Sequence, residues 1–360
     1  MKSYLLFSVL LLLTGWTYAQ GPGSIENIDV SQRTGEEERV VDIAFTLSGG
    51  DYYAIKLDVK FQEGDDFTPI QADEIMGLDS DDIIDTHLDE TIIGAIIVEA
   101  GEVELTWDGR ENYAEIDAAA ARVEITAARG LKDIDGNFYK TVLIGDQEWM
   151  AENLRVTRYN NEEKDPIPTG LSNDAWGSAT SGGYAIYPPS DIDGLASEAE
   201  VVEAYGKLYN WYAVDDERGL CPTGWRVPTN DEWTALVDYI VDSYDYHNDS
   251  ESDGINGVGN ALKSCRQVGH PDDGDCDTSE HPRWNADGTH SGFDEFGFSA
   301  LPGGLRWPND FHHLGEVGTW WSSNGWNGDA NRRYVSHDEG SVVSTSFGKT
   351  AGFSVRCIKD

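Results

Sequence analysis

Basic residues are scarce in this chain of 360 residues, which has 25 Lys and Arg against 66 Asp and Glu and a net charge of −41. Such a chain repels nucleic acid and anionic membrane surfaces, so both classes of partner are excluded. Cysteine is also rare, and the four cysteines of the chain are too few for a disulfide scaffold. After the N-terminal apolar run, no stretch reaches the length of a membrane span.

Aromatic residues, in contrast, make up 11% of the chain and include 12 Trp. A disordered acidic chain lacks the bulk to bury a core, so this composition indicates a folded protein. The length predicts roughly two domains.

The N-terminus has the pattern of an export signal. Lys2 supplies a positive charge, and the apolar run from Tyr4 to Leu13 is as long as a signal-peptide core and shorter than a membrane span. We expect cleavage after the small residue Ala19, so that residues 1–19 are a signal peptide. No Cys follows the run, so lipid attachment is not expected. The mature protein is expected to be secreted or at the cell surface, or in the periplasm, where disulfides are permitted.

Apolar and polar residues alternate in the first region. The alternating positions are Val41, Ile43, Phe45 and Leu47; Ile55, Leu57, Val59 and Phe61; Val103, Leu105 and Trp107; and Val123 and Ile125. Period-two alternation indicates strands with one buried face. Gly49-Gly50-Asp51, Gly64-Asp65-Asp66 and Asp108-Gly109-Arg110 are predicted turns. The spacing predicts an all-β, immunoglobulin-like sandwich over residues 21–128 that has no inter-sheet disulfide.

Acidic residues are densest in this first region. Residues 21–128 hold 27 acidic and 6 basic residues, and the remaining 129–360 hold 39 and 18 over about twice the length. The cluster of Asp79, Asp81, Asp82, Asp85, Asp89 and Glu90 offers carboxylates to calcium, although a solvated face is the favoured interpretation. Ala127 to Gly130 is the expected domain junction.

The second region mixes short helices with strands. Asp135-Gly136-Asn137 predicts a turn of a hairpin over residues 133–144, with a calcium loop as the disfavoured alternative. Helices are expected at Glu148–Leu154 and Glu198–Val214. Thr229 and Glu232 have capping-box spacing and predict a helix start. The positions that follow at helical spacing form one buried stripe: Trp233, Leu236, Val237, Ile240, Val241 and Tyr244. Strands are expected at 334–336, at 341–346 and along the terminal Phe353, Val355 and Cys357.

Six segments of this region, in order, resemble the Fibrobacter succinogenes major paralogous domain. They are QEWMAENLRVTRYN (147–160), YGKLYNWYAV (205–214), CPTGWRVPTNDEW (221–233), FSALPGGLR (298–306), GTWWSSNGW (318–326) and GFSVRCIKD (352–360). The resemblance covers residues 131–360 and implies an α+β C-type-lectin-like fold, related to the scaffold of formylglycine-generating enzymes. The family is found mainly in exported proteins of Bacteroidota-type bacteria and has no agreed activity.

The resemblance also bears on the four cysteines, for which three pairings exist. C-type-lectin-like domains nest an inner disulfide inside an outer one, which implies Cys221–Cys357 and Cys265–Cys276. Around the inner pair, Asp273, Asp275, Asp277 and Glu280 alternate in a closed loop and are a candidate calcium site, although a hydrated acidic loop is the favoured interpretation. Asp249, Glu251 and Asp253-Gly254 have only partial calcium-loop spacing, because Asn260 stands where a Glu is expected.

Catalysis has weaker support in the sequence. Formylglycine-generating enzymes use a late pair of cysteines, and no Cys lies between Gly304 and Cys357 here, so the resemblance ends at the scaffold. His312-His313 and Ser322-Ser323 are the remaining candidates, but a catalytic triad requires convergence that adjacent residues do not provide. No catalytic residue is assigned.

Sugar recognition is one of the two forms of the leading expectation, which is recognition of a glycan or a protein. Calcium-dependent lectins carry a Trp-Asn-Asp motif, from which Trp307-Pro308-Asn309-Asp310 departs by an inserted Pro, so calcium-bridged recognition is not expected. Direct recognition by stacking is the remaining way to bind a sugar, and a structural role for the tryptophans is the favoured alternative. The candidate ligand-binding residues are Trp307, Asn309, Asp310, His312, Trp326, Asn327 and Arg332, while Trp320 and Trp321 are expected in the core. The predicted function is non-catalytic recognition of a glycan or a cell-surface protein. The alternatives are an enzyme with an unrecognised hydrolytic site and a structural surface or matrix protein.

Overall fold

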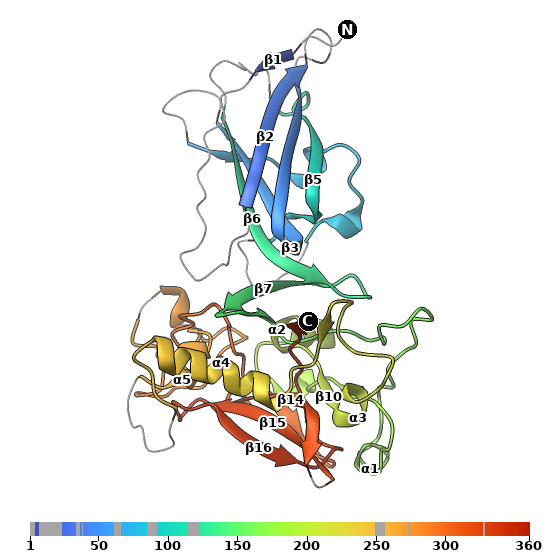
Figure 1. The fold of residues 1–360 in the computed structure, drawn as a ribbon, viewed down its shortest axis with the longest axis vertical. Coiled ribbons are helices and arrows are strands. Elements are labelled where there is room, and N and C mark those ends of the chain that lie inside the picture. The colour runs from blue at the N-terminus through green and yellow to red at the C-terminus, as the bar shows by residue number, and fades with distance from the viewer. Residues whose placement is uncertain are drawn as a thin grey trace. The chain divides into compact units, whose positions relative to one another are not determined.

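The chain divides into two compact units, Met1–Leu131 and Lys132–Asp360. The computed structural model describes residues 4–6, 24–33, 37, 39–60, 66–84, 92–113, 122–248, 256–272, 274–326 and 328–360, without the side chains of 4–6, 275 and 326. In both units strands contain more residues than helices (Figure 1). Of the predicted signal peptide only Tyr4–Leu6 (β1) is described, as a strand paired with Ser31–Arg33. Within the described ranges, no helix has the length and apolarity needed to cross a membrane.

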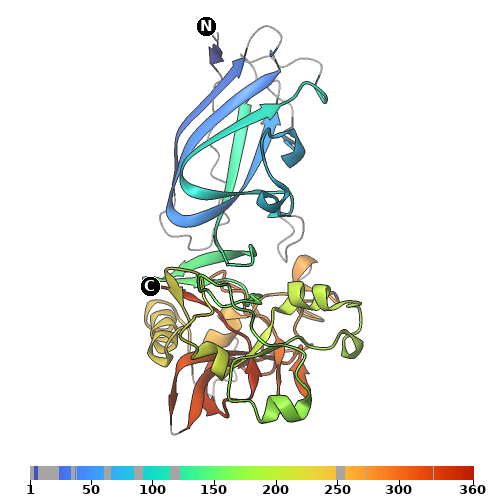
Figure 2. The ribbon, with the colours of Figure 1, turned by 90° about the vertical axis from the view of Figure 1, so that its right-hand side faces the viewer.

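The first unit is organised around one long central strand. Its elements are β2 (Ser24–Arg33), β3 (Val40–Lys60), β4 (Thr68–Pro69), β5 (Ile96–Asp108), β6 (Arg122–Lys132) and the 3-10 turns η2 (Ala72–Glu74) and η3 (Ser80–Asp82). The first half of β3 pairs with β2 and the end of β5; its second half pairs with β4, β6 and the start of β5. Figure 2 shows these long, bent strands side by side. Alternate residues of β3, including Ile43 and Ile55, pack with Trp107 in an apolar core.

The predicted turn at Gly49-Gly50-Asp51 is wrong, because these residues lie inside the continuous strand β3. The register with β5 shifts between Leu47 and Tyr52, which marks a bulge. Gly49 has a φ of 93° and Gly101 on β5 a φ of 126°, a left-handed region that glycine enters without steric cost. The glycines therefore bend the ladder without reversing the chain. The predicted turn at Asp108 to Arg110 is confirmed, whereas Phe61, Gly64 and Asp65 lie outside the described residues.

The second unit contains three sets of antiparallel strands. The first set is β7 (Phe138–Ile144), β8 (Gln147–Met150), β18 (Ile358–Lys359) and β11 (Trp225–Arg226). The second is β13 (Phe311–Leu314), β12 (Gly303–Arg306), β17 (Gly352–Phe353), β10 (Leu208–Asn210) and β9 (Tyr184–Ala185), and the third is β14 (Val317–Trp326), β15 (Asp329–Ser336) and β16 (Val343–Phe347). The helices are α1 (Asn173–Gly177), α2 (Glu198–Tyr205), α3 (Trp211–Val214), α4 (Asn230–Ser243) and α5 (Val258–Leu262), with η5 (Pro189–Asp191) and η6 (Gly274–Cys276).

Two predicted helices of this unit are wrong. Residues 148–150 belong to strand β8, which follows β7 through a tight turn at Gly145 and Asp146 and buries Trp149. The predicted helix Glu198–Val214 is interrupted after Tyr205, and β10 separates α2 from α3. Gly206 is the cause, since it has a φ of 75° and a Cβ there would lie 2.7 Å from the Cβ of Asn153.

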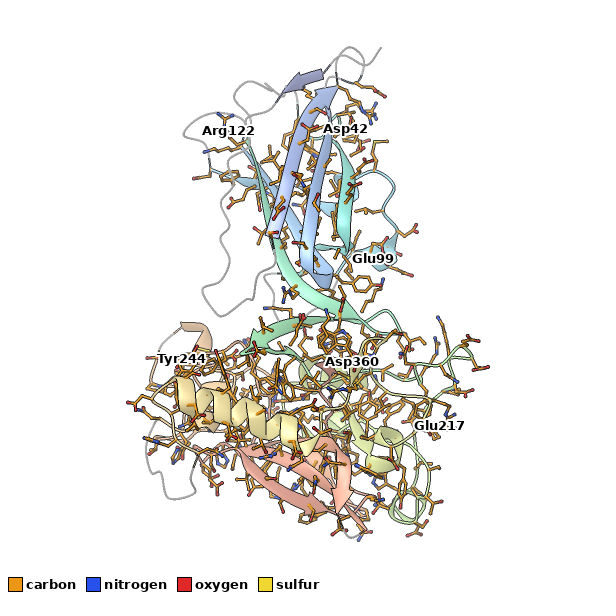
Figure 3. All side chains as sticks on the ribbon, in the orientation of Figure 1. Asp42, Glu99, Arg122, Glu217, Tyr244 and Asp360 are labelled. Carbon is orange, nitrogen blue, oxygen red and sulfur yellow. A yellow bond between two sulfur atoms is a disulfide. The ribbon has the colours of Figure 1, made fainter. Side chains whose placement is uncertain are left out.

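Helix α4 begins where the sequence predicts. Thr229 caps it, and the capping box with Glu232 is formed in both directions. Trp233, Leu236, Val237 and Ile240 are buried, whereas the last predicted position, Tyr244, is the C-cap residue and is 41% exposed (Figure 3). The helix lies beside β15, whose Arg333 donates to Thr234 Oγ1 and to the Asn230 carbonyl.

Candidate binding site

Two disulfides hold the loops of the second unit. Cys221 is bonded to Cys357 and Cys265 to Cys276, which agrees with the pairing implied by the resemblance. The first bridge joins residues 136 apart in sequence and ties the segment before β11 to the segment before β18. In the chain-entropy account a loop of this size stabilises the folded state by on the order of 4–5 kcal/mol.

The hairpin of β12 and β13 carries an exposed tryptophan at its turn. The backbone N–H of Trp307 donates to the backbone carbonyl of Asp310 over 2.8 Å, which closes the four-residue turn. The Trp307 ring is 40% exposed and lies 4.4 Å from the His312 ring, tilted by 43°. His313 follows at 6.1 Å and contacts Glu316. The ring is therefore held by a neighbour while part of it remains open to solvent.

Beneath the turn, Arg306 is sandwiched between two rings. Its guanidinium lies 4.3 Å from the Trp176 ring centroid and 5.0 Å from that of Phe311. One Nη donates to the Leu171 carbonyl and to Asn173 Oδ1, both over 3.2 Å, and burial lowers the Arg306 pKa. Asn173 in turn donates to the Asn309 carbonyl, so α1 supports the exposed turn from below.

A second cation–aromatic cluster surrounds Arg332 on β15. The Arg332 guanidinium lies 5.0 Å from the Tyr334 ring, 5.0 Å from the Phe347 ring and 4.9 Å from the Phe353 ring. Its Nε is buried and has no hydrogen-bond partner in the described part of the chain. An unsatisfied buried donor costs about 1–3 kcal/mol, and burial lowers the Arg332 pKa because the charged form loses water contacts.

The two clusters meet at strand β17. Gly352 pairs in register with Arg306, and the next residue, Phe353, carries a ring that Arg332 covers. Alternation along paired strands puts Phe353 on the same sheet face as Leu305, and Leu305 pairs with His312. The Trp307–His312 pair and the Arg332 guanidinium therefore flank one sheet face, and its interior is filled by Phe353 and the buried Trp321 ring 4.2 Å away.

The predicted ligand-binding residues are only partly gathered here. Trp307, Asn309 and Asp310 are exposed on one turn, and His312 is half-buried on the strand that follows it. Arg332 is half-buried on β15, which belongs to a different set of strands. Asp310 Oδ1 accepts from the Phe311 N–H, which leaves its other oxygen toward solvent. The Trp326 side chain and Asn327 lie outside the described residues. Trp320 and Trp321 are buried, as expected of core residues.

The acidic loop closed by the inner disulfide is only partly described. Asp277 Oδ1 accepts from the Gly269 N–H over 2.8 Å, and Glu280 is exposed. Asp273 and the Asp275 side chain lie outside the described residues, as do Asp85, Asp89, Glu90, Asp249, Glu251 and Asp253. Among the His, Cys, Asp and Glu side chains that are described, no group of three or more is arranged to hold a metal ion.

The predicted turn at Asp135 to Asn137 is formed, and the Asp133 side chain is bonded within it. Asp133 Oδ1 accepts from the N–H groups of Asp135 and Asn137, and Asp133 Oδ2 accepts from Asn137 Nδ2 and the Tyr139 hydroxyl. Protein donors therefore bond to both oxygens of Asp133 and stabilise the turn.

In the described structure, no hydrogen bond joins His312 or His313 to Ser322 or Ser323. Ser322 is buried, and its Oγ has no partner among described atoms. His313 Nδ1 lies 2.8 Å from Glu316 rather than from a hydroxyl.

Sequence reasoning missed most of the residues that shape the surface. These residues come from five separate elements: Arg306, Trp176, Tyr334, Phe347 and Phe353. In the sequence, only the alternation of Arg332 with Tyr334 along one strand indicates a shared face.

The fold and site define a mostly β protein of two units, whose second unit is clasped by disulfides and presents an aromatic and cationic surface. Residues 142–359 match the family model of the Fibrobacter succinogenes major domain, and the chain belongs to this family. Neither a curated protein nor a solved structure matches the chain.

Proposed function

We propose that this protein is exported and binds a glycan, without catalysis, through the β12–β13 turn of its second unit. In this proposal the second unit has a C-type-lectin-like fold, and the first is an immunoglobulin-like sandwich that acts as a spacer at the cell surface.

The exposure of Trp307 carries the proposal. Ten tryptophans have described side chains; nine of them are buried, and Trp307 alone among these ten is exposed. Burying a tryptophan ring is strongly favourable, so leaving one open on a supported turn is costly unless a ligand covers it. Sugars stack their apolar faces on such rings, and the amide of Asn309 and the carboxylate of Asp310 stand beside it to read hydroxyl groups.

Export is supported by three independent features. The N-terminal residues have the charge and apolar pattern of a signal peptide, both disulfides are of the kind that persists in oxidising compartments, and the high negative charge suits a protein that stays in solution. Calcium is proposed as an accessory ion of the acidic loop at Asp273, Asp275, Asp277 and Glu280, apart from the stacking surface.

A glycan array probed with the purified protein, with and without calcium, tests this function. We expect binding to a subset of glycans that Trp307→Ala reduces at least tenfold, because one stacked ring is lost. Tyr244→Ala is the matched control, since Tyr244 is a similarly exposed aromatic on α4 and should leave binding unchanged. Absence of binding to any glycan above background, in either condition, would refute the proposal.

A further inference from the structure

Arg332 differs from the other arginines of this acidic chain. Arg155, Arg158, Arg218 and Arg226 pair with carboxylates, and Arg306, Arg333 and Arg356 donate to carbonyl or side-chain oxygens. In the described part of the chain, no hydrogen bond or ion pair is found for Arg332. With 66 acidic residues available, an unpaired arginine is the unexpected arrangement.

The surroundings of Arg332 fix its position while leaving its donors unused. Three rings at 4.9–5.0 Å hold the guanidinium by cation–π contact, and none of them offers a strong acceptor. The side chain is half-buried, so part of the planar fork faces solvent. A guanidinium of this kind is preorganised for two parallel hydrogen bonds to a planar or tetrahedral oxyanion.

We propose that Arg332 is an anion-binding residue and that the ligand is a saccharide carrying a carboxylate or sulfate group. The inference rests on the proposed glycan-binding function and specifies its ligand class. In this arrangement the sugar ring stacks on Trp307 and the acidic group binds the Arg332 guanidinium, which lies against Phe353 in the strand next to β12. The overall charge of −41 repels such a ligand at long range, but physiological salt screens charges beyond about 8 Å, so the local contact decides binding.

The test compares three soluble probes on the full protein at physiological salt: polygalacturonate for carboxylate, dextran sulfate for sulfate and dextran as the neutral probe. We expect at least one acidic probe to bind tenfold or more tightly than dextran. Arg332→Gln should weaken the acidic interaction about ten- to a hundredfold, the usual range for a hydrogen bond to a charged group, and should weaken binding of neutral glycans by much less. Arg332→Lys keeps the charge and loses the fork, so it should recover only part of the affinity.

Arg158→Gln is the matched control, because it removes the same charge from a side chain that is 49% exposed and pairs with Asp135 elsewhere in the unit. Near-ultraviolet circular dichroism verifies that each variant is folded. The preference of the unmodified protein for acidic probes over dextran tests the inference without any variant. Equal binding of acidic and neutral probes, or an equal loss on both in Arg332→Gln, would overturn this inference and leave the proposed function standing. Absence of binding to these probes and to the glycan array would instead refute the proposed function.

Discussion

In the first unit, backbone groups pair mostly within long ladders, and β3 alone runs for 21 residues, whereas β9, β11, β17 and β18 of the second unit have two residues each. Short strands leave many loop carbonyls without a ladder partner, and buried carbonyls require donors. In the second unit buried side chains supply them. Arg356 donates to the carbonyls of Phe298 and Ser299, and Lys263 to those of His290, Ser336 and Glu339.

The difference teaches that the two units reach stability by different means. The first relies on regular pairing around an aliphatic core, and the second on covalent bridges and buried polar groups that specify irregular loops. The second unit, which carries the exposed candidate site, is therefore the one in which disulfides and buried hydrogen bonds hold each loop in place. A rigid binding surface requires loops that are held in this way.

Removing the long disulfide should have the largest effect. The double variant Cys221→Ala with Cys357→Ala should lose on the order of 4–5 kcal/mol of the unfolding free energy of the second unit, since its unfolded chain regains the freedom of a large loop. Hydrogen exchange read peptide by peptide measures this, with residues 40–60 as the internal control that should keep their protection. An equal loss of protection in both units would contradict the comparison.

Replacing Arg356 by Met should cost nearly as much. The guanidinium is fully buried, also donates to Asn153 Oδ1, and its loss leaves several carbonyls without donors, so we expect destabilisation of about 3–5 kcal/mol. Urea unfolding followed by tryptophan fluorescence reports it, because all but two of the tryptophans lie in the second unit. Arg158→Met should change stability by less than about 0.5 kcal/mol, and a similar loss in both variants would show that burial is not the cause.

In the first unit the corresponding test is to create a cavity in the apolar core by truncating a buried side chain. Ile55 is completely buried on β3, so Ile55→Ala should destabilise that unit by about 3 kcal/mol and Ile55→Val by about 1 kcal/mol. Hydrogen exchange of residues 40–60 measures the change. A loss much smaller than this for Ile55→Ala would show that the ladder, rather than the core, dominates the first unit.

The smallest expected effect is a pH dependence confined to the second unit. The Tyr205 hydroxyl lies 2.5 Å from His281 Nδ1, and burial, aided by the charge of Arg283, lowers the His281 pKa below its usual 6.5. As the pH falls through 6.5, His281 is therefore protonated in the unfolded chain before it is protonated in the folded protein. The stability that neutral His281 contributes is complete above pH 6.5 and is lost as the pH falls below that value.

Unfolding of the unmodified protein and of His281→Gln between pH 7.5 and pH 5 measures this loss. The stability advantage of the unmodified protein should shrink toward the acid end. An advantage that stays constant over that range would exclude His281 as the source.

Helix α4 could be predicted because every signal for it is local. Thr229, Glu232 and the apolar stripe lie within one segment, and the structure agrees with all but the last residue of that stripe. The bulge at Gly49 and the helix end at Gly206 could not be predicted from local sequence. A glycine permits a turn, a bulge or a close contact, and a residue far away in the sequence decides which of these forms. Gly206 is constrained by Asn153, which lies more than fifty residues earlier.

The exposed residues of the candidate site could be predicted from the sequence, but the buried residues that hold them in place could not. Trp307, Asn309 and Asp310 are consecutive or nearly so, and their sequence marks a polar turn with an aromatic residue. The rings around Arg332 come from β15, β16 and β17. Strand register places β15 beside β16, but β17 belongs to a different set of strands, and only tertiary packing brings its Phe353 ring to Arg332. Likewise, a lone Arg356 between Val355 and Cys357 signals a buried charge, but nothing in the sequence identifies the carbonyls that it satisfies.

The bulge at Gly49 also determines how the first unit tolerates changes in chain length. The two halves of β3 send alternate residues to the same core on either side of this point. Deleting Gly49 or Gly50 alone would keep every apolar residue of the strand, yet it would rotate Tyr53, Leu57 and Val59 toward solvent while polar neighbours turned inward. A length variant that removed two residues would restore the phase, so in this stretch the parity of an insertion or deletion matters more than its size.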